Sequence, residues 1–71
     1  MNKFCVILPI KTGDIGKILG NRVFNCRVDD NDKVMILNEQ NEVIKIIKSQ
    51  ECQFVNEYDF EIKESGYMWL K

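Results

Sequence analysis

Three short apolar-rich segments separated by two polar loops constrain this chain more than any other feature. The segments span residues 22–28, 33–37 and 42–48, and the loops read Asp29-Asp30-Asn31-Asp32 and Asn38-Glu39-Gln40-Asn41. Asp and Asn are common in tight turns because they hydrogen-bond their own backbone and tolerate left-handed conformations. The pattern therefore predicts an antiparallel meander, and with it a small, mainly β domain.

The meander segments differ in how their apolar residues are spaced. Phe24, Cys26 and Val28 alternate with polar residues, which predicts a half-buried strand with these three side chains on the core face. Segment 33–37 is apolar on both faces. The stripe Val43, Ile44 and Ile47 in segment 42–48 also fits a helix. We expect a strand there, because β-branched residues dominate the segment.

The segments on either side of the meander are expected to complete the domain. Residues 4–8 form an apolar run stopped by Pro9, which predicts a strand buried on both faces. Residues 11–16 contain two glycines and predict a loop. Ser49 is a suitable cap for a short helix over residues 50–56, with Phe54 and Val55 toward the core. In that helix Cys52 would be the most exposed of the cysteines.

The C-terminal part predicts a hairpin. Tyr58, Phe60 and Ile62 alternate with charged residues, as in a half-buried strand. Glu64-Ser65-Gly66 fits a three-residue hairpin loop with glycine in the left-handed position. Residues 67–70 would form the returning strand.

Length and composition indicate one ordinary domain. The 71 residues are enough for a single domain, residues 1–71, and carry a formal net charge of −1. No secretory leader and no apolar stretch long enough to span a membrane is recognisable. The three cysteines match no zinc or redox spacing. We expect free thiols and a cytoplasmic monomer that does not contact membranes.

The residues needed for most enzyme chemistry are missing. The chain has no histidine, which removes the usual proton shuttle and the Ser-His and Cys-His nucleophile pairs. Residues 13–17 lack the full phosphate-loop pattern, and the loop at residues 29–32 lacks the register of a calcium site. The carboxylates of Asp59 and Glu61 share a strand face, but so small a domain leaves no room for a sugar cleft. We predict no catalytic, cofactor or metal-binding residue.

Two surfaces remain as binding candidates. An acidic, aromatic C-terminal segment would suit a protein partner; its residues are Tyr58, Asp59, Glu61, Tyr67 and Trp69. The alternative for its aromatic side chains is that they fill the core.

The second candidate surface is basic. Residues 1–28 hold five basic residues and one acidic residue. Lys11, Lys17, Arg22 and Arg27 would bind single-stranded nucleic acid by neutralising phosphates. The overall acidity of the chain argues against this alternative.

The whole chain resembles the YorP family of small phage and prophage proteins. The resemblance lies in Phe4-Cys5-Val6-Ile7-Leu8-Pro9, in Gly13-Asp14-Ile15-Gly16-Lys17 and in Gly66-Tyr67-Met68-Trp69-Leu70. It implies an SH3-like small barrel of about five antiparallel strands, with one short helix between two strands. It implies no function and supplies no functional residues. The missing catalytic residues and the acidic, aromatic C-terminal segment are the reasons for our expectation. We expect a non-enzymatic accessory protein that binds another protein, of phage or host origin.

Overall fold

The fold is mainly β, with one short α-helix and one turn of 3-10 helix. The computed structural model describes residues 3–63 and 66–71, and for residues 17–19 it describes the backbone alone. The elements in chain order are β1 (Lys3–Ile7), α1 (Gly13–Leu19), β2 (Arg22–Val28), β3 (Lys33–Leu37), β4 (Val43–Lys48), η1 (Ser49–Glu51), β5 (Cys52–Val55), β6 (Phe60–Ile62) and β7 (Met68–Leu70). All pairings among these strands are antiparallel.

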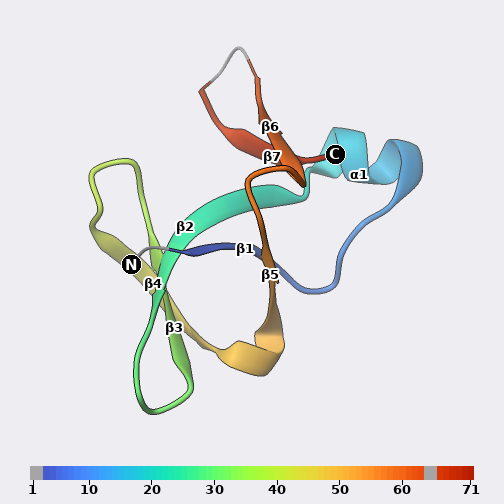
Figure 1. The fold of residues 1–71 in the computed structure, drawn as a ribbon. Coiled ribbons are helices and arrows are strands. Elements are labelled where there is room, and N and C mark those ends of the chain that lie inside the picture. The colour runs from blue at the N-terminus through green and yellow to red at the C-terminus, as the bar shows by residue number, and fades with distance from the viewer. Residues whose placement is uncertain (1–2, 64–65) are drawn as a thin grey trace.

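Strand β2 organises the sheet because three other strands pair with it. One edge of β2 pairs with β1, and β5 follows beyond β1. The other edge is shared: its C-terminal part pairs with β3 and its first two residues pair with β7. The main path is therefore β4-β3-β2-β1-β5, and the β6–β7 hairpin joins it through β7. Figure 1 shows β2 as a long curved strand that links the β3–β4 hairpin to the β6–β7 hairpin.

The two Asp- and Asn-rich loops form the turns that the sequence predicts. Asp29 Oδ1 accepts hydrogen bonds from the backbone N–H groups of Asn31 and Lys33, at 2.8 and 3.0 Å. In the second loop Asn38 Oδ1 accepts hydrogen bonds from the backbone N–H groups of Gln40 and Glu42, both at 2.9 Å. The last residue of each loop, Asp32 or Asn41, has a φ of +63°. The side chain at the start of each loop thus replaces backbone partners, and the meander forms as predicted.

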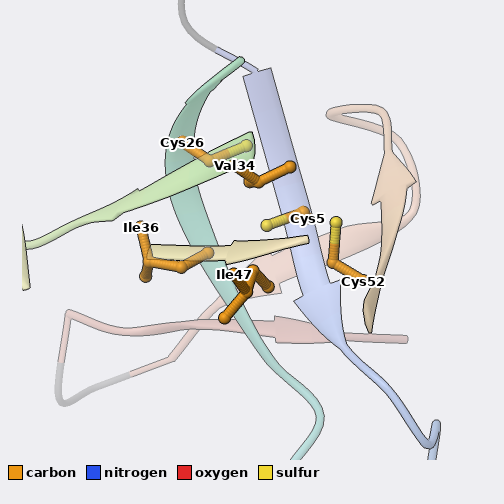
Figure 2. Close-up of a cluster of buried hydrophobic side chains, with 6 residues drawn as sticks. All are labelled: Cys5, Cys26, Val34, Ile36, Ile47 and Cys52. Carbon is orange, nitrogen blue, oxygen red and sulfur yellow. The ribbon is translucent and has the colours of Figure 1, made fainter. Parts of the chain in front are cut away.

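The hydrophobic core lies on both faces of the central strands. A cluster of six buried residues fills one side, and its side chains converge in Figure 2: Cys5, Cys26, Val34, Ile36, Ile47 and Cys52. On the opposite face Val6, Val23 and Leu37 are also buried. Consecutive residues of β1 and β3 are therefore both inside, which explains why these strands read as continuous apolar runs. Val28, expected on the core face, is exposed near the end of β2.

Two local predictions are wrong. Residues 13–19 form α1 and not a loop; Gly20, with a φ of +78°, ends the helix and donates its N–H to the carbonyl of Gly16 at 2.8 Å. The predicted helix over residues 50–56 is also absent. The 3-10 turn ends at Glu51, and β5 begins at once with a buried Cys52. Pairing with β1 determines this, because Leu8 donates to the carbonyl of Glu51 and the ladder continues from there.

The sheet also differs in extent from the implied barrel. The described residues hold seven strands where about five were expected, and the sheet does not close into a barrel. The strand that the segment-by-segment prediction lacks is β5, which stands in place of the predicted helix, whereas β6 and β7 form the predicted C-terminal hairpin. Glu64 and Ser65, predicted in the loop of this hairpin, lie outside the described residues. Among the described residues next to it, Gly66 has a φ of +83° and Lys63 donates its N–H to the carbonyl of Tyr67.

Candidate functional site

Tyr58 is the most exposed aromatic side chain among the described residues and lies in the turn between β5 and β6. The backbone N–H of Tyr58 donates to Asn56 Oδ1, and the backbone N–H of Asp59 donates to the carbonyl of Asn56, both at 3.0 Å. Asp59 Oδ2 accepts from the N–H of Asn56 at 3.1 Å. These bonds fix the turn, yet the Tyr58 side chain remains 78% exposed. The local sequence therefore holds a tyrosine out in solvent on an ordered turn.

A shallow groove of about 330 Å³ begins at this tyrosine. Its lining residues come from β1, β5 and the turn: Lys3, Phe4, Phe54, Val55, Asn56, Glu57 and Tyr58. Phe54 contributes an exposed ring, with the ammonium of Lys3 5.3 Å from its centroid. Phe4 packs against Phe60, with ring centroids 4.9 Å apart. The groove therefore has an apolar floor, one cation and one carboxylate at its rim, and no catalytic pair.

The other aromatic residues predicted for this surface lie elsewhere. The Tyr67 ring stacks with the guanidinium of Arg22, which lies 3.9 Å from its centroid. Trp69 is half-buried and packs on Gly20, where an added Cβ would collide with the indole ring. Glu61 is exposed opposite Trp69 in the β6–β7 ladder, 4.0 Å from the ammonium of Lys63. The five predicted residues therefore fall into two groups: Tyr58 and Asp59 on one turn, and Glu61, Trp69 and Tyr67 on or next to the β6–β7 hairpin.

Sequence reasoning missed Phe54 and Lys3 as neighbours of Tyr58. Phe54 was assigned to the core side of a helix that does not form. No local signal reveals this position, because alternation in a strand places Phe54 on the same face as the buried Cys52, and only the location of β5 at the edge of the sheet leaves its ring exposed.

The basic residues predicted for nucleic-acid binding do not form one surface. Lys11 and Arg22 line the same hollow of about 300 Å³, beside Asn21. Arg22 is already engaged: its guanidinium forms a 2.9 Å ion pair with Glu39 and lies between the rings of Phe24 and Tyr67. Arg27 is exposed at the far end of β2, opposite Met35. Lys17 lies on α1, but its side chain is outside the described residues.

The three cysteines are core residues with free thiols. All three side chains are buried and none is disulfide-bonded. The thiol contact with Cys26 and burial together raise the pKa of Cys5, and burial also raises the pKa of Cys52. Cys52 is the most exposed of the three, as predicted, but at 7% it is still buried because β5 turns it into the core. Across residues 3–63 and 66–71, no group of His, Cys, Asp or Glu is arranged to hold a metal ion.

Comparison with known proteins adds no relative to this picture. No family model, no curated protein and no solved structure matches the chain. Within the part of the chain that the structure describes, no helix is long and apolar enough to cross a membrane.

Proposed function

We propose that this chain is a non-enzymatic protein-binding module, an accessory protein of phage or prophage origin that works as a monomer in the bacterial cytoplasm. The observation that carries the proposal is the pair of exposed aromatic rings, Tyr58 and Phe54, at the groove beside β5. Tyrosine is enriched at binding hot spots because it supplies a large, rigid contact area and a polar tip. Glu57 at the rim and Asp59 on the same turn place two carboxylates beside Tyr58, and Lys3 is the one cation that lines the groove.

The position of β5 supports the same proposal. β5 is the last strand of the main path, so one of its edges carries no strand among the described residues. We propose that a partner segment inserts an apolar side chain between Phe54 and Tyr58, with a basic residue near Glu57 and Asp59. The predicted residues Glu61, Tyr67 and Trp69 would then act at a distance, by holding the β6–β7 hairpin in place.

Capture of partners from a host lysate tests this proposal. Wild-type protein should retain a partner that Tyr58→Ala loses and that Ile62→Ala retains. Ile62 is the matched control because it is an exposed apolar residue of the next strand and does not line the groove. A Tyr67→Ala/Trp69→Ala double variant, checked for folding, tests the second half of the predicted surface. Identical partners for wild type and Tyr58→Ala would rule out the groove.

We further propose that the main path is an SH3-like small barrel that stays open between its outer strands, β4 and β5. Support comes from the order β4-β3-β2-β1-β5 with a single 3-10 turn between β4 and β5, which is the five-strand arrangement with one helix that the family resemblance implies. The β6–β7 hairpin would be an addition to it. A solution structure with measured contacts between the outer strands would test whether they close.

Single-strand nucleic-acid binding is the second candidate. Its support is the common hollow of Lys11 and Arg22, which Asn21 shapes by donating to the carbonyl of Lys11 and accepting from its N–H. Titration with an oligothymidylate at low salt should shift the amides of residues 11–22 if this candidate is right. The absence of such shifts would remove it.

A further inference from the structure

The outer face of the meander carries a row of residues that sequence spacing does not reveal. In the register of the sheet Arg27 lies opposite Met35, and Met35 lies opposite Ile46. Directly opposite residues of antiparallel strands share a face. Val34, Ile36 and Ile47 point to the core, so this row points the other way. Ile46 is 61% exposed and its neighbour Ile44 is 54% exposed, so the middle of this face is apolar and open to solvent.

Cations surround this apolar centre. Lys33 and Lys48 face each other directly across β3 and β4, on the same face as Met35 and Ile46. Ser49 donates its N–H to the carbonyl of Asp32, and hydrogen-bonded pairs alternate along a ladder. The two lysines therefore form a non-hydrogen-bonded pair, with Cα atoms about 4.5 Å apart. Like charges directly opposite each other are destabilising.

None of the described carboxylates forms an ion pair with these cations. The ion pairs within the described residues join Arg22 to Glu39 and Lys63 to Glu61, so Arg27, Lys33 and Lys48 have none. Three acidic side chains of the adjacent turns accept hydrogen bonds from other groups. Asp29 accepts from backbone N–H groups, Asp32 from the Ser49 hydroxyl and Glu51 from the N–H of Lys48. The face thus combines three unpaired cations with exposed isoleucines.

The edge of β4 offers backbone groups to the same side of the sheet. β4 is the first strand of the main path, and no described strand pairs with its outer edge. Since Met35 and Ile46 form another non-hydrogen-bonded pair, the N–H and C=O of Ile46 point away from β3. The N–H of Lys48 already donates to Glu51 Oε1. Residues 43–46 are therefore the part of this edge where a partner strand could pair. An extended segment can add a strand there.

We propose that β4 binds an extended acidic segment of a partner protein, in which carboxylates alternate with apolar side chains. The partner adds a strand to the open edge at residues 43–46. Its apolar side chains cover Ile44, Ile46 and Met35, and its carboxylates neutralise Arg27, Lys33 and Lys48. Charge complementarity selects this occupant over a second copy of β4, because two copies would bring more lysines together. This surface is separate from the groove at Tyr58.

A peptide titration tests the proposal. The probe is a short blocked peptide of alternating glutamate and valine, and the control peptide alternates lysine and valine. At low salt the acidic peptide should shift the amides of residues 43–48 and of Lys33, and the basic peptide should not. Equal binding of the two peptides, or shifts confined to other regions, would overturn the proposal.

Matched variants separate the charge effect from the strand effect. Lys33→Glu/Lys48→Glu should weaken binding at least about tenfold, because each reversal replaces an attraction by a repulsion. Lys63→Glu/Lys71→Glu makes the same change in net charge elsewhere and should leave affinity unchanged, as should Tyr58→Ala. Ile46→Pro removes the outward N–H without removing a bond to β3, and should weaken binding about tenfold with the circular dichroism spectrum retained. Should Ile46→Pro unfold, the charge variants decide.

Two other outcomes would also overturn the proposal. The first is that an oligothymidylate shifts the same amides while the acidic peptide does not, which would make the face a nucleic-acid surface. The second is that these amides shift with protein concentration alone, which would identify a second copy of this chain as the occupant.

Discussion

Two isoleucines on paired strands allow a direct test of which side of the meander is the core. Ile36 on β3 is 1% exposed and belongs to the six-residue core cluster, whereas Ile46 on β4 is 61% exposed on the opposite face. The chemical change in Ile36→Ala and Ile46→Ala is identical, and the two residues have the same β propensity. Any difference in stability between the variants therefore reports the difference in burial.

The expected sizes follow from the carbons removed. Truncation of isoleucine to alanine removes three carbons, which is about 2.4 kcal/mol when the side chain is fully buried. The cavity left at Ile36 should bring its cost to about 3–4 kcal/mol. Ile46 is about two-fifths buried, so its truncation should cost about 1 kcal/mol. A chain of 71 residues has a total stability of about 4–11 kcal/mol, so Ile36→Ala removes a large part of it.

Urea denaturation followed by tryptophan fluorescence measures this difference. Trp69 is the only tryptophan, and its half-buried ring on Gly20 should change emission on unfolding. The midpoint should fall much further for Ile36→Ala than for Ile46→Ala, with an unchanged denaturant slope. In thermal melts 1 kcal/mol corresponds to about 4–8 °C for a domain of this size. Equal losses for the two variants, or a larger loss for Ile46→Ala, would refute the assignment of the faces.

Two further predictions concern Gly20 and the buried thiols. Gly20→Ala should lower the free energy of unfolding by about 2 kcal/mol or more, because alanine is strained at a φ of +78° and its Cβ would collide with the indole. The displaced indole should also shift the Trp69 emission to the red. An unchanged midpoint and spectrum would contradict this. The raised pKa of Cys5 means that only the unfolded chain releases the thiol proton near pH 8.5. Stability should thus be constant below about pH 8 and fall above it, by up to about 1.4 kcal/mol per pH unit for this thiol. Urea titrations between pH 7 and 9.5 measure the slope, Cys5→Ala should make it shallower, and a flat wild-type profile would contradict the prediction.

The meander was predictable because its information is local. Asp29 and Asn38 each satisfy the turn that follows them with their own side chain, so the ends of β2, β3 and β4 are determined within a few residues. The hairpin around Gly66 is predictable for the same reason, since glycine adopts the left-handed conformation that its loop requires.

The misassigned helices show where local information is insufficient. Glycines 13 and 16 lower helix propensity, yet α1 spans both of them. A Cβ at Gly16 would collide with the carbonyl of Lys11, so this glycine serves close packing. Segment 50–56 has an acceptable helix start, but its strand pairing with β1 is between residues almost fifty positions apart. No window of sequence contains that partner.

The candidate sites divide in the same way. Tyr58 and Asp59 were named from an alternating pattern typical of a strand, but the structure places them on the turn before β6, where Tyr58 is exposed. Tyr67 was identifiable as an aromatic residue, but only the structure shows that Arg22 covers its ring. The row of Arg27, Met35 and Ile46 exists only through the register of three strands, because these residues have no common spacing in the chain.

By itself the sequence determined the mainly β class, the meander with its turns and the absence of histidine chemistry, because each depends on residue type or on neighbours within a few positions. The tertiary structure alone decided the path β4-β3-β2-β1-β5, the burial of Cys52 and the two separate exposed surfaces. These depend on which strands pair and in which register, and pairing energy arises between residues far apart in the chain.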